Sequence, residues 1–305
     1  MSDAHDTTSS ATGVPRLGQV DPATGVAAGP VARAYRHLVL GVAAVAALLP
    51  ILYMVAISTG GADPGSPFLE GGVSEAAGRT VDNYRGVFAD ENTDFPLYLR
   101  NTLWIAILGT LGTTLSSAVV AYGFSRVRWK GRDAVFIVVL ATMMVPFPVV
   151  MVPLFTIFRE LGWIGTFMPL WVPAWFGNAF SIFLLRQFFL SIPKELDEAS
   201  RIDGCGHLRN FIHVILPLST PALLVVALFH FMFVWNDFLG PLVFLTHRDQ
   251  FTLALGLQLF LSKLGQTPWN LLMAATTIMV APVLVLFVLM QRTFVEGIST
   301  TGTKG

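Results

Sequence analysis

The stretch SIPKELDEASRIDGCGHLRNFIHVILP, from Ser191 to Pro217, is polar and lies between two long apolar runs. It carries too many charges to cross a bilayer, where a charged side chain costs about 3 kcal/mol at the centre. The flanking runs, Met168 to Phe189 and Leu218 to Leu239, each hold roughly the 20 apolar residues that a helical span needs. The stretch therefore predicts a water-exposed loop between two transmembrane helices.

The composition of the whole chain agrees with a membrane location. Of 305 residues, 54% are hydrophobic and 12% are charged, and the mean hydropathy is +0.66. About a quarter of the residues of a soluble domain are charged, so an ordinary soluble domain is excluded. The 19 acidic and 19 basic residues balance, which gives no electrostatic reason to expect nucleic acid. The single cysteine, Cys205, excludes an internal disulfide and offers no metal cluster.

Six segments are long and apolar enough to span a membrane. They are residues 38–57, 102–124, 134–158, 168–189, 218–239 and 271–290. The predicted fold is an all-α integral membrane protein with six transmembrane helices, formed by residues 37–305 and preceded by a flexible tail at residues 1–36. The apolar run from Phe251 to Leu261 has about half the length needed to cross, so we expect a surface or re-entrant helix there.

Prolines interrupt the third and fourth of these segments, at positions 146, 148, 153, 169 and 173. A proline removes a helical hydrogen bond, and inside a membrane the freed backbone groups must be satisfied by protein or water. We therefore expect both helices to pack inward. Three tryptophans near the predicted external end of the fourth segment, Trp163, Trp171 and Trp175, are typical of an interfacial belt.

The loop charges predict the orientation of the chain in the membrane. Basic residues gather after the second and the fourth segment, at Arg126, Arg128, Lys130, Arg132, Lys194, Arg201 and Arg209. Short loops rich in lysine and arginine face the cytoplasm, so both loops are predicted there. The acidic segment between the first two spans is then external, and six spans place both termini in the cytoplasm. The predicted location is the plasma (inner) membrane.

The polar loop contains the signals of one short helix. Pro193 suits a first helical turn, and the acidic residues at 195, 197 and 198 favour the positive end of a helix. Gly204 or Gly206 suits the C-terminal stop.

One side of this predicted helix is apolar. Leu196, Ala199 and Ile202 recur at three-residue spacing and share one stripe. A short helix with an apolar stripe and no room in lipid predicts a protein partner.

The loop resembles the EAA loop of permeases in binding-protein-dependent ABC importers. That pattern is Glu-Ala-Ala, a Gly four residues after the last Ala, and then Ile-x-Leu-Pro. The matching residues, in which Ser200 replaces the second Ala and Val214 the Ile, are Glu198, Ala199, Ser200, Gly204, Val214, Leu216 and Pro217. Asp203 before the Gly matches a common form of the motif.

The resemblance extends over most of the chain, from about Arg36 to Gly305. Further matching stretches are Asn101–Leu103, Ala121–Arg126, Trp235–Phe238 and Thr303–Gly305. Together they resemble the second permease subunit of carbohydrate importers of the maltose type.

The resemblance implies a mechanical role and a set of partners. The loop helix would sit in a groove of a cytoplasmic ATPase dimer, with Glu198 in a polar contact and Gly204 letting the chain turn back. The other implied partners are a second permease subunit and an extracellular or periplasmic solute-binding protein. The chain has no Gly-rich phosphate loop, so ATP and magnesium would be held by the ATPase and no cofactor by this chain.

Four polar residues are weaker candidates for a substrate path. Asn236 and Asp237 lie late in the fifth predicted span, where they either contact solute or sit hydrated at the external interface beside Trp235. Asn178 and Ser181 in the fourth span either face a path or hydrogen-bond a neighbouring helix.

Two other classes of protein remain to be weighed. An ion-coupled secondary transporter or channel commonly needs ionisable relays inside its spans, and the third, fourth and sixth segments contain no acidic residue within their apolar stretches. A membrane enzyme would need paired carboxylates, a histidine cluster or a nucleophile motif, and we assign no catalytic and no metal-binding residue. The favoured function is an importer permease, which is not itself an enzyme.

Overall fold

The computed structural model describes residues 30–60, 73–90, 93–261 and 267–299, and each regular element in these ranges is helical. The chain divides into two compact units, residues 1–53 and 54–305. The described part of the first unit belongs to α1 (Pro30–Ser58), an apolar helix of 29 residues. The N-terminal tail before residue 30 and the Thr303–Gly305 stretch lie outside the described residues.

The second unit contains the remaining helices. In chain order they are α2 (Val73–Ala89), α3 (Phe95–Ser125), α4 (Arg132–Thr142), α5 (Phe147–Glu160), α6 (Met168–Trp171), α7 (Ala179–Ser191), α8 (Glu195–Ile202), α9 (His207–Asn210), α10 (Leu216–Leu218), α11 (Thr220–Trp235), α12 (Leu239–Phe244), α13 (Leu253–Gly256) and α14 (Trp269–Ser299). Shorter turns connect them: η1 (Pro173–Phe176), η2 (Phe211–Ile215), which is π-helical, η3 (Arg248–Gln250) and η4 (Leu257–Phe260).

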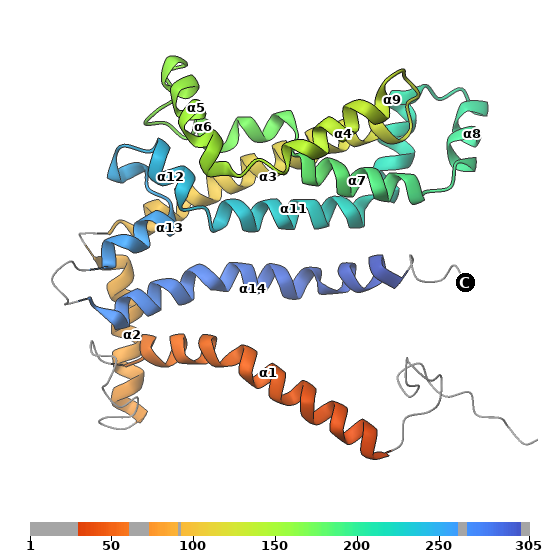
Figure 1. Ribbon diagram of the computed structural model, residues 1–305. Helices are drawn as coiled ribbons and strands as arrows, with labels where there is room; N and C mark the ends of the chain where they lie inside the picture. The colour runs from red at the N-terminus through yellow and green to blue at the C-terminus, as the bar shows by residue number, and fades with distance from the viewer. Residues whose placement is uncertain (1–29, 61–72, 91–92, 262–266, 300–305) are drawn as a thin grey trace, which may run out of the picture. The chain divides into compact units, whose positions relative to one another are not determined.

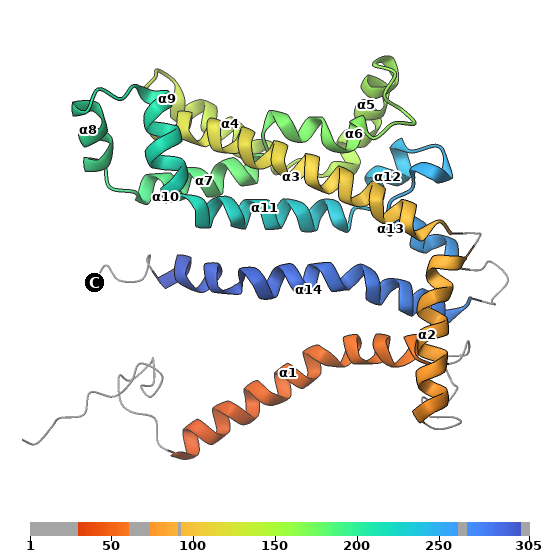
Figure 2. The ribbon, with the colours of Figure 1, turned by 180° about the vertical axis from the view of Figure 1, so that it is seen from behind.

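The centre of this unit is α3, which packs along α7 and α11 (Figures 1 and 2). Fully buried apolar side chains from these helices form the core, among them Leu185, Phe189 and Val226. Glycines let the helices approach closely: the space beside Gly109 of α3 is taken by His230 of α11. The elements that carry the predicted loop are thus anchored on one long central helix.

The helices coincide with the six predicted spans. Among the described residues, four helical stretches are long and apolar enough to cross a membrane, and the number rises to six if each of two bent pairs counts as one span. The α4–α5 pair bends by 97° and the pair formed by residues 207–218 and 220–235 bends by 77°. An all-α fold with four to six candidate spans is therefore observed.

Of the two proline-rich spans that are expected to pack inward, one does so within this chain. In α7 the side chains of Ile182, Leu185 and Phe189 are buried. In α5, by contrast, Val149 and Val152 are 65% and 67% exposed. At the α4–α5 break, part of the backbone is satisfied locally by tight turns such as Met143 N to Leu140 O at 3.1 Å.

The fourth span is broken beside the middle of α3. Its η1 turn ends at Gly177, which has a φ of +92°, and the carbonyl of Ala174 accepts from Ser116 Oγ at 3.2 Å. The Trp175 ring lies so close to Gly112 that a Cβ there would meet it at 2.4 Å. Trp175 therefore packs against the midpoint of α3, which corrects the prediction that it belongs to an interfacial belt.

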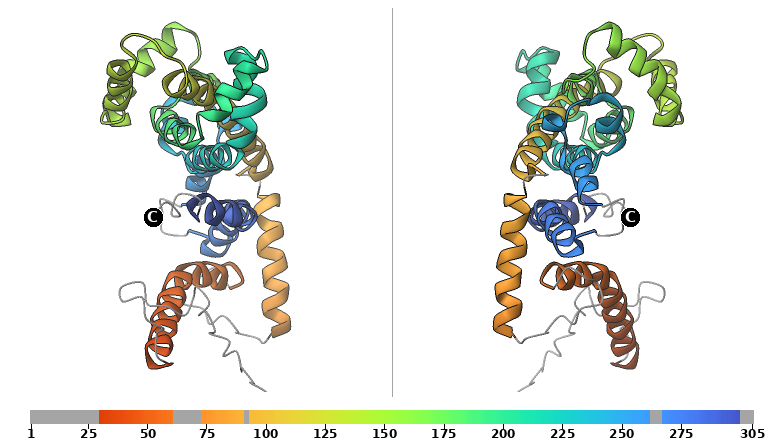
Figure 3. Two further views of the ribbon diagram at one scale, coloured as in Figure 1. Left: turned by 90° about the vertical axis from the view of Figure 1, so that its right-hand side faces the viewer. Right: turned by 90° about the vertical axis from the view of Figure 1, so that its left-hand side faces the viewer.

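At the far end from the predicted loop, α2 runs across the start of α14 (Figure 3). Asn83 of α2 joins three segments there, since its Nδ2 donates to Ser58 O at 2.9 Å and its Oδ1 accepts from Asn270 Nδ2 at 2.7 Å.

The run from Phe251 to Leu261 also lies at this end, and it is not a surface helix. It forms α13 and η4, and Leu253, Leu255 and Phe260 are buried against the start of α3. Hydrogen bonds from Asn101 Nδ2 to Phe251 O (3.1 Å) and from Leu253 N to Thr102 Oγ1 (2.8 Å) hold it in place. The segment is part of the core, and it is not among the helices of the described residues that are long and apolar enough to cross a membrane.

Candidate functional site

The predicted loop helix is present as α8, Glu195–Ile202, and lies across the end of the bundle (Figure 2). Its first turn carries three acidic side chains, which favour the positive end of the helix. It begins at Glu195, two residues after Pro193. Pro193 therefore precedes the helix and does not lie in its first turn, where the sequence places it. The short helix is thus placed beyond the ends of α3 and α7.

Gly204, and not Gly206, ends α8. Gly204 has a φ of +78°, whereas Gly206 has a φ of −75°. Hydrogen bonds from Gly204 N to Arg201 O (3.0 Å) and from Cys205 N to Ser200 O (2.9 Å) complete a Schellman motif. The space around the Gly204 Cα is open, so the left-handed backbone alone calls for glycine.

The outer face of α8 is exposed. The apolar stripe remains uncovered within the chain, with Leu196 40% and Ile202 87% exposed and Ala199 also exposed. Glu198 lies exposed on the same helix. A stripe of this kind next to a carboxylate suits a polar-rimmed apolar contact with another protein.

The inner face of α8 is held to the bundle by a buried ion pair. Arg126 Nη1 lies 2.5 Å from Asp197 Oδ2, and the two side chains are only 6% and 15% exposed. Arg126 Nη2 also donates to the carbonyl of Ile192 at 2.7 Å and to that of Phe189. The guanidinium therefore joins the end of α3, the end of α7 and α8.

A second set of hydrogen bonds completes this attachment. Asn210 Nδ2 donates to Asp197 Oδ1 (2.8 Å) and to Tyr122 Oη (3.3 Å), and Asn210 Oδ1 lies 3.0 Å from Ser200 Oγ. Tyr122 Oη in turn donates to the carbonyl of His207 at 3.0 Å. We call Arg126, Asp197, Ser200, Asn210 and Tyr122 the α8 clamp.

The other motif residues lie in different places. Ser200 is 6% exposed and faces the bundle, so its hydroxyl is not part of the outer face of α8. Asp203 forms the C-terminal boundary of the helix. Leu216 packs on the core and Pro217 is exposed, both on the turn that enters α11.

A kink separates this turn from α11. Pro221 lacks the N–H that would bond to the carbonyl of Pro217, which accepts instead from Thr220 Oγ1 at 2.8 Å. The motif thus spans two helices, the exposed α8 and the bent entry to the fifth span.

Two of the predicted path residues form a helix cap. Asn178 Oδ1 accepts from Ser181 N at 3.1 Å and lies 3.3 Å from Ser181 Oγ, at the start of α7. Asn178 is exposed and Ser181 is 4% exposed. This cap satisfies the backbone freed at the break of the fourth span.

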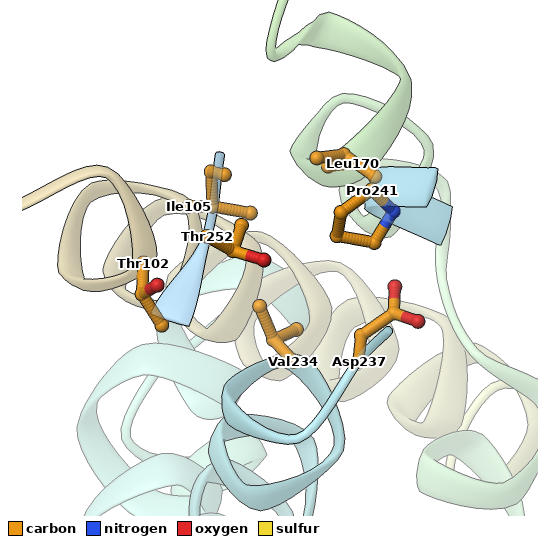
Figure 4. Close-up of a pocket in the computed structure, with 7 residues that line it drawn as sticks. All are labelled: Thr102, Ile105, Leu170, Val234, Asp237, Pro241 and Thr252. Atoms are coloured by element: carbon orange, nitrogen blue, oxygen red, sulfur yellow. The ribbon is translucent and has the colours of Figure 1, made fainter. Parts of the chain in front are cut away.

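The other two predicted path residues end α11. Asn236 is exposed and donates back to Met232 O at 2.8 Å, and Asp237 Oδ1 accepts from Gly240 N at 3.1 Å. Asp237 also lines a cavity of about 10 Å³, at the lower limit for one water, with Thr102, Ile105, Leu170, Val234, Pro241 and Thr252 (Figure 4). Solute contact by these residues stays a prediction.

Two groups inside the bundle are not predicted from the sequence. Arg126 is predicted as one of the loop charges, although its side chain is only 6% exposed. His230 is not among the predicted residues, and its ring nitrogens lie 3.3 Å from Thr113 Oγ1 of α3. An ionisable residue in the middle of a predicted span was the available signal for His230.

Comparison with known proteins decides the family. Residues 112–300 match the model of the binding-protein-dependent transport system inner membrane component. The chain belongs to this family of permeases. The predicted resemblance is thereby confirmed, and the chain is an integral protein of the inner membrane.

The permease has full-length relatives among transport proteins of known name. It is 36% identical to the trehalose/maltose transport system permease protein MalG of Thermococcus litoralis, over 86% of this chain and 93% of the relative. It is 32% identical to the arabinooligosaccharides transport system permease protein AraQ of Halalkalibacterium halodurans (88% and 96% covered). It is also 32% identical to the lactose transport system permease protein LacG of Rhizobium radiobacter (86% and 93% covered).

A solved structure has the same fold as the permease. It is a bacterial ABC transporter involved in the import of the acidic polysaccharide alginate, and one of its chains matches with a TM-score of 0.73 and 25% sequence identity. The match covers 87% of the permease and 98% of that chain.

Proposed function

We propose that this permease forms half of the translocation path of an ATP-driven importer and couples to a separate ATPase through α8. The observation that carries the proposal is the two-sided nature of this helix. Its outer face leaves an apolar stripe and Glu198 uncovered, while its inner face is fixed to the bundle through Asp197, whose side chain is 15% exposed. A short helix that is anchored on one side and unpartnered on the other suits transmission of movement between two proteins.

The solute is proposed from the relatives. Those named above are permeases for trehalose and maltose, arabinooligosaccharides, and lactose. We propose that this permease carries a sugar or related polyol, delivered by an external solute-binding protein. A second permease subunit completes the path, and an ATPase dimer holds ATP and magnesium.

The proposed orientation places α8 and the loop after α3 in the cytoplasm, with both termini on the same side. The basic residues of these loops support this orientation. The exposed apolar side chains of α4 and α5 would then face lipid or the second permease.

The docking surface is tested by two substitutions with matched controls. In sealed vesicles that contain the assembled transporter, Glu198→Lys and Gly204→Val are expected to leave the permease in the membrane and to abolish ATP-dependent uptake. The first reverses a charge on the outer face. The second places a β-branched residue at a left-handed backbone position, at a cost of roughly 1–2 kcal/mol, and deforms the end of α8.

The controls are Glu195→Lys, which makes the same charge change in the first turn of α8, and Gly206→Val, at an ordinary φ with open space around it. Both should retain uptake, as should Gly204→Asn, because asparagine tolerates the left-handed conformation. Normal uptake in Glu198→Lys and Gly204→Val would contradict docking through α8. Uptake by the permease alone, indifferent to ATP and abolished by an uncoupler, would instead establish the ion-coupled alternative.

A further inference from the structure

We infer that Arg126 and Asp197 are positioning residues that make α8 move as one body with α3 and α7, an inference that rests on the proposed function. Docking alone does not move the membrane helices, because a short helix on two loops can swing by itself. The α8 clamp removes that freedom.

The Arg126 side chain is the joint between three helices. Arg126 is the C-cap residue of α3. Its guanidinium donates to the carbonyls of Phe189 and Ile192 at the end of α7 and to the carboxylate of Asp197 of α8. Arginine presents several N–H donors in one rigid plane, so one side chain fixes these elements relative to one another. A cation at the C-terminal end of α7 is also favoured by the helix dipole.

Asp197 is the residue of α8 that accepts these contacts. One of its carboxylate oxygens faces Arg126 and the other accepts from Asn210, which also contacts Tyr122 of α3. A movement of α8 is therefore transmitted to α3 by two separate contacts of Asp197. One carboxylate oxygen contacts Arg126 directly, and the other contacts Tyr122 through Asn210.

Burial distinguishes this ion pair from the other ion pairs of the described chain. In the pair of Arg159 and Glu160 the side chains are 63% and 72% exposed, and pairs of that kind stabilise little because water screens them. The Arg126–Asp197 pair is 6% and 15% exposed, so water screens it less than the exposed pairs, and removing either partner leaves the other charge unpaired. The pair is therefore expected to hold α8 more firmly than an exposed pair would.

The clamp and the docking surface use different faces of α8. Asp197 and Ser200 face the bundle, whereas Ala199 and Ile202 face outward. A change in the clamp can thus alter the transmission of movement without altering the surface offered to the ATPase.

The test compares uptake with ATP hydrolysis in proteoliposomes that contain the assembled transporter. Asp197→Asn preserves the size of the side chain but removes its charge. We expect it to lower the amount of solute moved per ATP by on the order of tenfold, with ATP hydrolysis still running. Docking is read separately by cross-linking Ile202→Cys to the ATPase, in a background that carries Cys205→Ser, and the cross-link yield should not change.

Two further variants guard against a simple folding defect. Arg126→Lys keeps a charge beside Asp197 but cannot also reach both carbonyls of α7, and it should show the same loss of coupling with a normal amount of protein in the membrane. Glu195→Gln changes an exposed carboxylate of the same helix and should leave the ratio unchanged.

The possible outcomes separate this inference from the proposed function. A normal ratio of solute to ATP in Asp197→Asn or in Arg126→Lys overturns the clamp and leaves docking intact. Loss of the cross-link in Asp197→Asn also overturns it, because the residue would then shape the docking surface itself. Absence of any cross-link from Ile202→Cys in the otherwise unchanged protein, with normal uptake in Glu198→Lys, would reject the proposed function.

Discussion

Ser200 shows how one residue of a motif can serve the inside of the molecule. Its position in the pattern suggested a docking role, but the side chain is buried and its Oγ lies 3.0 Å from Asn210 Oδ1 and 2.9 Å from Asp197 O. The hydroxyl has one hydrogen to donate between these two acceptors. The serine therefore adds a polar contact to the α8 clamp.

Ser200→Ala, which restores the residue of the EAA pattern, should weaken the fold and leave docking unchanged. Buried Asn210 Oδ1 would lose a donor, at a cost of about 1–3 kcal/mol. Thermal unfolding in detergent should detect the loss, and Ser191→Ala, which removes an exposed hydroxyl, is the control. A higher yield of the Ile202→Cys cross-link to the ATPase in the Ser200→Ala protein would instead show that the hydroxyl faces the partner.

At the scale of the element, glycines of one helix have opposite roles. Gly112 of α3 lies against the Trp175 ring, whereas the space beside Gly123 of the same helix is open. The broken fourth span approaches α3 at the first of these positions, so packing leaves no room for a side chain at position 112 but leaves room for one at position 123.

Gly112→Ala and Gly123→Ala should therefore change stability in opposite directions. The first forces the Trp175 ring away and should cost about 1–3 kcal/mol as overpacking. The second should gain up to about 1 kcal/mol from helix propensity. Melting temperatures of the purified permease in detergent check both signs, and a stabilised Gly112→Ala would mean that Trp175 does not rest on α3.

At the scale of the whole molecule, the bend of the α4–α5 pair determines how often the chain crosses the membrane. The α4–α5 pair, bent by 97°, either crosses once or returns to the side from which it entered. The two cases place every later loop on opposite sides.

Cysteine labelling distinguishes them. With Cys205→Ser as background, a membrane-impermeant maleimide added to intact cells should label Asp82→Cys and His247→Cys. Lys130→Cys and Arg209→Cys should react only after the membrane is opened. Labelling of Lys130→Cys and Arg209→Cys from opposite sides would show that the α4–α5 pair is re-entrant and would reduce the number of spans.

The sequence by itself determined what depends on neighbouring residues. The apolar runs, the polar loop between the fourth and fifth of them, and the stop of α8 near Gly204 are set by composition, spacing and local backbone preference. These features were enough to predict the fold class and the family, and to place α8 within two residues.

Only the tertiary structure decided which face of α8 is free and how the other is held. Arg126 and Asp197 are 71 residues apart in the chain, and in the sequence each is one more charge in a polar loop. Their burial follows from the meeting of the ends of α3 and α7 beside α8, which no local pattern encodes. For the same reason the sequence predicts a surface or re-entrant helix for the apolar Phe251–Leu261 run and does not predict its place in the core, where Asn101, 150 residues from Phe251, holds it. Contacts between distant segments depend on how helices pack, and that is determined by the fold as a whole.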